Sequence, residues 1–161
     1  MLKVNVDDVP WETYVSPKGS CRGSYKDLSL ALGAARHANQ FNGGHPFDLA
    51  IEKLAPGETL CPYHDHASQY ELFYIIGGSG TVRSSGESHL VKTGDVIMHP
   101  PGDAHQIINT GETDLTYILI ADNPPLDVCR YPDSNKAGVF AGTSRRELFR
   151  TTEVDYWDGE E

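Results

Sequence analysis

Hydrophobic and polar positions alternate along the middle of the chain, in short runs that are separated by turns. The first run, residues 47–54 (FDLAIEKL), is followed by the turn residues Pro56 and Gly57, and the same pattern then recurs. Further strands are predicted over residues 59–66, 71–76, 80–83, 88–91, 95–99, 105–109 and 115–121. Many short strands at this spacing predict an all-β fold, either a sandwich or a barrel.

The two flanks of this region are less regular. Residues 1–44 are predicted to form an N-terminal arm with one short helix over residues 26–32, capped by Ser24 and ended by Gly33. Residues 122–161 have too few apolar side chains for a core of their own, although residues 128–131 can form one more strand. We therefore expect three parts, which are an arm (1–44), a barrel (45–121) and a C-terminal tail (122–161) that packs on the barrel or on a partner subunit.

Charge and composition limit the classes of molecule that the protein is expected to bind. The 161 residues include 13 Lys and Arg against 23 Asp and Glu, a net charge of −10, which disfavours nucleic acid and anionic membranes. The apolar runs are far shorter than the roughly 20 residues that span a bilayer. The three cysteines lack the CxxC spacing of a zinc or redox site and are too few for a disulfide scaffold, so we expect a cytoplasmic protein.

Three histidines and one glutamate have the spacing of a metal site. His64 and His66 are separated by one residue, and on a strand such a pair projects from the same face. Glu71 follows after a short turn, and His105 begins a later strand. Three imidazoles and a carboxylate that converge inside a small barrel would hold a divalent transition ion such as Fe, Mn, Ni, Co or Zn.

The full arrangement of these residues resembles the cupin superfamily. The first cupin motif, G-x5-H-x-H-x(3,4)-E-x6-G, is similar to residues 57–78, and the second, G-x5-P-x-G-x2-H-x3-N, fits residues 94–109 (GDVIMHPPGDAHQIIN). One departure is that six residues, not five, separate Gly57 from His64. The resemblance implies a double-stranded β-helix, the cupin or jelly-roll barrel, and assigns the metal-ligand role to His64, His66, Glu71 and His105.

The resemblance covers roughly residues 45–121, and the flank adds a narrower one. The strings ADNPP, YPDSNK and YWDGEE look like a group of small bacterial cupins, some of which carry sugar-phosphate isomerase labels. Short cupin barrels also resemble known dimers, so we expect a homodimer. The motif residues Gly78, Gly94, Gly102, Pro100 and Asn109 are expected to shape the turns between strands and not to bind substrate.

Strand alternation predicts the wall of the cavity. If Glu71 points inward, Phe73 and Ile75 do so too, and His105 takes Ile107 and Asn109 with it. In the strand over residues 115–121, alternation separates Leu115, Tyr117 and Leu119 from Thr116, Ile118 and Ile120, and it leaves open which of the two sets faces the metal. Cys61 is predicted to point away from the metal, and His99 is expected to be a half-exposed strand residue. The groups considered for acid/base or substrate-orienting roles are Tyr70, Gln106 and Tyr117, with Tyr63, Arg83 and His99 as further candidates.

Three functions remain open for such a site. The ion can support oxygen chemistry of the dioxygenase type, or it can stabilise an enediolate in isomerase or lyase chemistry while a cavity base moves a proton. In both cases the substrate would be a small oxygen-rich metabolite, such as a hydroxy acid, a keto acid or a sugar-like molecule. The third possibility is a non-catalytic cupin that binds a small molecule as a sensor.

Overall fold

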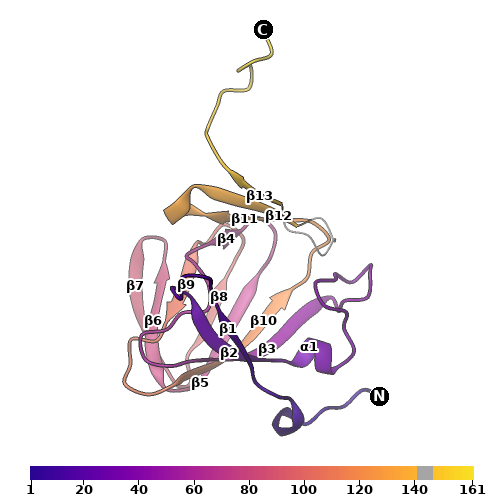
Figure 1. The fold of residues 1–161 in the computed structure, drawn as a ribbon, viewed down its shortest axis with the longest axis vertical. Helices are drawn as coiled ribbons and strands as arrows, with labels where there is room; N and C mark the ends of the chain where they lie inside the picture. The colour runs from indigo at the N-terminus through magenta and orange to yellow at the C-terminus, as the bar shows by residue number, and fades with distance from the viewer. Residues whose placement is uncertain (141–146) are drawn as a thin grey trace.

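The strands of the protein form three antiparallel sheets, which are drawn in Figure 1 from a computed structural model that describes residues 1–140 and 147–161. The largest sheet has the order β1-β2-β3-β10-β5-β8. Its strands are β1 (Glu12–Val15), β2 (Arg22–Asp27), β3 (Phe47–Leu54), β10 (Leu115–Asp122), β5 (Glu71–Gly77) and β8 (Val96–His99). Because β3, β10 and β5 are neighbours in space but not in sequence, distant segments meet in the middle of this sheet.

Two smaller sheets complete the barrel, one packed against the large sheet and the other at one end. One has the order β7-β6-β9 and the other the order β13-β12-β11-β4. Their strands are β6 (Ser79–Ser84), β7 (Glu87–Lys92), β9 (His105–Ile108), β4 (Asp65–His66), β11 (Asp127–Tyr131), β12 (Lys136–Phe140) and β13 (Glu147–Arg150). A β-bridge between His64 and His105 links the two sheets. The all-β double-stranded β-helix expected from the sequence is therefore confirmed.

The core lies between the large sheet and the sheet packed against it, and it follows the predicted alternation. Phe73 and Ile75 on β5 and Ile107 on β9 are buried, and Asn109 is fully inaccessible. On β10 the set left open by the sequence is settled, because Leu115 and Tyr117 are buried in the same cluster. The remaining members of the cluster are Leu54, Val82 and Val91. The inward faces of β5, β9 and β10 therefore continue from this apolar core to the polar site.

The N-terminal residues are more regular than the sequence pattern indicated. β1 and β2 extend the large sheet beyond β3, and a 3-10 helix, η1 (Val6–Asp8), and a single helical turn, α1 (Leu28–Ala31), accompany them. The prediction that Ser24 caps the helix is wrong, since Ser24 lies within β2 and the side chain of Asp27 accepts the capping hydrogen bond from the Leu30 N–H. Among the described residues no helix is long and apolar enough to cross a membrane.

The C-terminal residues build a sheet at one end of the barrel. β11, β12 and β13 lie across this end, and the last residues extend away from it (Figure 1). A 3-10 helix, η2 (Pro132–Ser134), connects β11 and β12. The strand predicted over residues 59–66 is reduced to β4, because the Pro62 ring interrupts the pattern upstream of it. Residues 141–146 of the predicted tail lie outside the described residues.

Two motif residues have structural roles. Gly78 has φ +76°, and a Cβ atom there would lie 2.3 Å from the carbonyl oxygen of Asp114, so no side chain fits. The side-chain amide of Asn109 donates to the carbonyl oxygens of Leu54 (2.7 Å) and Thr113 (2.8 Å). The glycine therefore permits the turn between β5 and β6, and Asn109 joins β9 to the ends of β3 and β10.

Candidate metal centre

The segment that contains β4 directs two imidazoles into the barrel. The backbone of His64 pairs with that of His105 by two hydrogen bonds (3.1 and 2.7 Å), and His66 lies opposite Cys129 on β11. Between them, Asp65 is buried and forms an ion pair with Arg130 at 2.6 Å. The His64 and His66 ring centroids are 5.0 Å apart, so the alternating backbone brings both rings to one place, as their spacing predicts.

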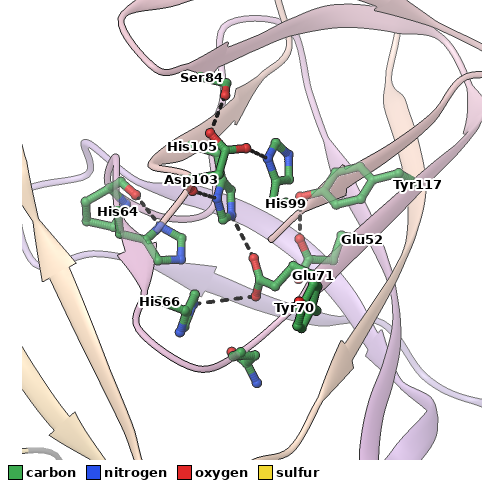
Figure 2. A network of polar contacts seen from close by, with 12 residues as sticks. Glu52, His64, His66, Tyr70, Glu71, Ser84, His99, Asp103, His105 and Tyr117 are labelled. Carbon is green, nitrogen blue, oxygen red and sulfur yellow. Dashed lines mark hydrogen bonds and ion pairs between the residues drawn. The ribbon is translucent and has the colours of Figure 1, made fainter. Parts of the chain in front are cut away.

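Glu71 and His105 complete the predicted set from two other strands. Glu71 is the first residue of β5, and one of its carboxylate oxygens is 2.7 Å from Nε2 of His105 at the start of β9. Its other oxygen is 3.7 Å from Nε2 of His66. Figure 2 shows the Glu71 carboxylate between these two imidazoles, with His64 beside them. The structure thus brings together all four residues that the motifs single out.

Each imidazole is fixed by a hydrogen bond at its Nδ1 atom. The partner is the Pro62 carbonyl for His64 (2.8 Å), the Asp103 carbonyl for His105 (2.9 Å) and the Asp127 carboxylate for His66 (2.6 Å). When Nδ1 carries the proton in such a contact, Nε2 is left with its lone pair, as in histidines that bind metals. Among the described residues, Nε2 of His66 is buried without a hydrogen-bond partner. A buried nitrogen with a free lone pair and no hydrogen-bond partner is what we expect of an atom that binds a metal ion.

Burial and neighbouring charges set the protonation of the cluster. Burial lowers the pKa of His64 to about 4, although the charge of Glu71 opposes this effect. Burial alone would raise the pKa of Glu71, but the hydrogen bond with His105 and the charges of the histidines outweigh it, so the pKa is lowered. The same contact raises the pKa of His105 in spite of burial. At neutral pH the cluster therefore offers a carboxylate and a neutral His64 imidazole.

Two groups of side chains are close enough to hold a metal ion. In the first, the ligand atoms of His64, Glu71 and His105 lie within 4.8 Å of one another, and in the second the same is true of His64, His66 and Cys129. The first group with His66 is the donor set expected from the sequence, and borderline divalent ions prefer such nitrogen and oxygen donors. The residues present therefore fit a divalent transition ion, whose identity they do not specify.

His99 packs against the His105 ring of this centre. The prediction of a half-exposed residue is wrong, since only 2% of its side chain is exposed. Its ring stacks on that of His105, with centroids 3.9 Å apart and planes inclined by 12°, and its Nδ1 is 2.7 Å from the Asp103 carboxylate. Strand parity places it here because His99 pairs with Glu71 across β5 and β8. His99 and Asp103 thus fix the orientation of His105.

A cavity of about 950 Å³ adjoins the centre. Phe73, Ile107 and Leu119 form apolar parts of its wall, and the wall also includes Glu52 and Tyr117. The Tyr117 hydroxyl donates a hydrogen bond to the Glu52 carboxylate, and Figure 2 shows this pair in the same network as Glu71. Burial raises the pKa of Glu52 to about 7, although the hydrogen bond from Tyr117 opposes the shift. An acid/base group therefore faces the same space as the ligand atoms.

The other predicted site residues lie elsewhere. Tyr70 is half exposed and Gln106 donates to the Cys61 carbonyl at 2.9 Å, and neither lines the cavity. The Arg83 guanidinium lies 3.8 Å above the Tyr63 ring and also pairs with Asp133, away from the cavity. Cys61, which was predicted to point away from the metal, lines the cavity. Of the three residues expected to be catalytic, only Tyr117 is brought to this space.

Sequence reasoning missed Glu52, Asp127 and Cys129. Glu52 lies on β3, in a segment that was predicted as a strand but that lies outside both motifs. Asp127 and Cys129 lie on β11, which contacts the site only because it pairs with β4. The alternation of β11 did carry a signal, because Asp127 and Cys129 share a face of a strand that was partly predicted.

Comparison with known proteins agrees with this fold. Residues 50–121 match the family described as Cupin domain. The oxalate-binding protein of Thermotoga maritima is 37% identical over 72 residues, which are 45% of this chain and 59% of that protein. The chain thus spans under two thirds of this curated relative.

Two solved structures share the fold over most of their length. One, from Acidithiobacillus ferrooxidans, has a TM-score of 0.79 at 21% identity and covers 93% of this chain and 90% of its own. The other is named a sugar phosphate isomerase from a cupin superfamily, from Silicibacter pomeroyi, with a TM-score of 0.75, 20% identity and 92% coverage of both chains. The domain match and the sheet topology identify residues 50–121 as a cupin domain, and the two solved structures share the fold of the chain around it.

Proposed function

We propose that this chain is a metal-dependent enzyme that moves a proton on a small oxygen-rich metabolite, in an isomerase or lyase reaction. The substrate class is a hydroxy acid, a keto acid or a sugar-like molecule. The observation that carries the proposal is the Glu52–Tyr117 pair, which lines the same cavity as His64, His66 and Glu71. A binding protein has no need of an acid/base group at this place.

The residues of the site would have two roles, metal binding and proton transfer. His64, His66, Glu71 and His105 would hold the ion, which would polarise a carbonyl or enolate oxygen of the substrate as a Lewis acid. Glu52, with a pKa of about 7, can accept a proton from carbon and return it, which is the protonation behaviour that general acid/base catalysis requires near neutral pH. Tyr117 orients the Glu52 carboxylate, and Phe73, Ile107 and Leu119 limit the access of water to it.

A second candidate function is small-molecule binding without turnover. It is favoured by the relative from Thermotoga maritima, which is named an oxalate-binding protein. The two candidates differ in what they require of Glu52. Binding of an acidic ligand gains nothing from a buried carboxyl group beside it, whereas proton transfer depends on that group.

Isotope exchange in heavy water tests the proposal. Protein loaded with Mn(II) or Fe(II) is incubated in D2O with a panel of keto acids, hydroxy acids, aldoses and ketoses, and deuterium incorporation next to the carbonyl carbon is followed by NMR. We expect exchange with at least one compound, and Glu52→Gln should slow it about 100-fold or more while metal binding is retained. The matched control is Glu87→Gln, because Glu87 is exposed on β7 and does not line the cavity.

The other outcomes overturn the proposal in distinguishable ways. Exchange at the wild-type rate in Glu52→Gln would remove Glu52 from the reaction. Substrate-dependent consumption of O2 would show dioxygenase chemistry instead. Saturable binding with no exchange under any metal would support the non-catalytic function.

We also propose that the protein is a homodimer. The outer face of the large sheet carries exposed apolar side chains on three adjacent strands, β10, β5 and β8. They are Tyr74, Ile76, Val96, Met98 and Ile120, and with the partly buried Leu72 they form cross-strand rows. A continuous exposed apolar face of this kind is typical of a protein–protein contact. Because these side chains point away from the interior that holds Phe73 and Ile75, a second copy can cover them without blocking the site.

A further inference from the structure

Cys129 lies at the metal centre although it belongs to the C-terminal sheet. It is 2% exposed, and it lies directly opposite His66 in the register of β4 and β11. Its Sγ atom and the ligand nitrogens of His64 and His66 are all within 4.8 Å of one another. Two residues before Cys129, the Asp127 carboxylate forms a hydrogen bond with Nδ1 of His66. The same face of β11 therefore provides both the residue that orients His66 and a sulfur atom beside it.

We propose that Cys129 is a metal-ligating residue, and that His64, His66 and Cys129 form a second donor set that takes soft ions such as Zn(II), Cd(II) and Cu(I). The first set, which includes Glu71 and His105, would take harder ions such as Mn(II) and Fe(II). His64 belongs to both groups, so the two ions compete for one place. The inference rests on the metal-binding cavity of the proposed function but is independent of the reaction.

The two donor sets differ in the metal ions that they prefer, because one includes a thiolate and the other a carboxylate. Thiolate ligands favour Zn(II), Cd(II) and Cu(I), whereas carboxylates favour Mn(II) and other hard ions. The buried Nε2 of His66 has no hydrogen-bond partner among the described residues, so it is available to either donor set. On binding, the Cys129 thiol gives its proton to solvent as the metal–sulfur bond forms, so soft ions should release more protons than Mn(II) does.

Cys61 offers a matched comparison. It lines the same cavity but belongs to neither group of ligand atoms. Burial raises the pKa of the Cys61 thiol well above its usual value, so this thiol stays protonated. If mere proximity to the cavity made a thiol a ligand, both cysteines would behave alike.

Cobalt substitution and metal competition test the assignment. Co(II) bound by a thiolate gives a sulfur-to-metal charge-transfer absorption band, which we expect in wild type and in Cys61→Ser but not in Cys129→Ser. Cd(II) should bind Cys129→Ser about tenfold or more weakly than wild type, with Mn(II) affinity nearly unchanged. The Mn(II) titration also shows whether each variant is folded around its metal site.

X-ray absorption of the wild-type protein loaded with Zn(II) needs no variant, and it should show a sulfur neighbour together with imidazole nitrogens. Only nitrogen and oxygen neighbours in this spectrum would overturn the proposal, as would a cobalt band that survives in Cys129→Ser or is lost in Cys61→Ser. Neither result depends on proton exchange, so failure here leaves the proposed reaction standing. If a sulfur neighbour is found and Glu52→Gln exchanges protons at the wild-type rate, the Cys129 assignment stands and the proposed reaction fails.

Discussion

At the scale of single residues, the buried carboxyl group of Glu52 has two consequences, one for catalysis and one for stability. Its folded-state pKa of about 7 lies above the ordinary value of 4.5, because burial raises it and the nearby charge of Glu71 adds to the effect. The folded protein therefore binds more protons at this group than the unfolded chain does between these two values. By linkage, this group lowers the free energy of unfolding as pH rises through that window.

Glu52→Gln should remove this dependence. Relative to wild type, the metal-free variant is expected to gain stability by about 3 kcal/mol between roughly pH 4.5 and 7, because each pKa unit corresponds to about 1.4 kcal/mol. Urea unfolding of both proteins at the two ends of the window measures the difference. Glu87→Gln serves as the control and should show no such change. A difference between Glu52→Gln and wild type that is the same at both pH values would contradict the prediction.

Residues that belong to a spaced pattern could be predicted, and residues that join the site only through pairing could not. His64, His66, Glu71 and His105 could be predicted because the first two share a strand face and because the spacing of all four resembles the two cupin motifs. Glu52 and Cys129 reach the site through the registers of β3 with β10 and of β11 with β4. Nothing in local sequence encodes a register between strands so far apart.

At the scale of elements, β11 acts as the support of β4. β4 has only two residues, too few to hold an imidazole by its own backbone, and β11 supplies both its pairing partner and Asp127. The Asp127 carboxylate contacts Nδ1 of His66 at 2.6 Å and accepts from the Ser68 N–H at 2.8 Å. The tail thus contributes to the site although it lies outside the cupin motifs.

Asp127→Asn should weaken metal binding about 10- to 100-fold with little loss of folded protein. The amide can still accept from Ser68, but its NH2 group then faces Nδ1 of His66 and favours the tautomer that carries its proton on Nε2. Calorimetric titration with Mn(II) measures the effect. Asp133→Asn is the control, since Asp133 pairs with Arg83 away from the cavity. An unchanged Mn(II) affinity in Asp127→Asn would show that His66 needs no such support.

The elements of the barrel followed from alternation and turn residues more closely than the flanks did. The segments predicted from 71 to 121 match β5 to β10 within a few residues. By contrast, β1 and β2 lack alternation and owe their extended form to pairing, of β2 with β3 and of β1 with β2. Pro62 interrupts the strand predicted over residues 59–66, and only β4 remains of it.

At the scale of the whole molecule, the large sheet is covered unevenly on its outer face. Near β3, Val9, Leu28 and Ile51 form a small cluster under the N-terminal residues. Over β10, β5 and β8 the apolar side chains remain exposed. The N-terminal residues therefore close one half of this face, and the other half is the part that we assign to the second copy.

Val96→Glu should shift the protein from dimer to monomer, because it places a charge on the exposed apolar face, opposite Tyr74. Sedimentation equilibrium at several protein concentrations measures the association constant. The control is Leu90→Glu on β7, because Leu90 is even more exposed than Val96 (87% against 62%) but lies in a different sheet. Monomeric wild-type protein, or a dimer that tolerates Val96→Glu, would contradict the proposed interface.

The size of the cavity has a consequence for the thermodynamics of ligand binding. At about 950 Å³ it is large enough for roughly thirty water molecules. A ligand that fills it would displace most of these from a partly apolar wall, which gives a negative heat-capacity change on binding. A molecule as small as a two-carbon acid would displace few of them. The heat-capacity change, measured across a series of ligands of increasing length, should therefore reveal the size of the natural one.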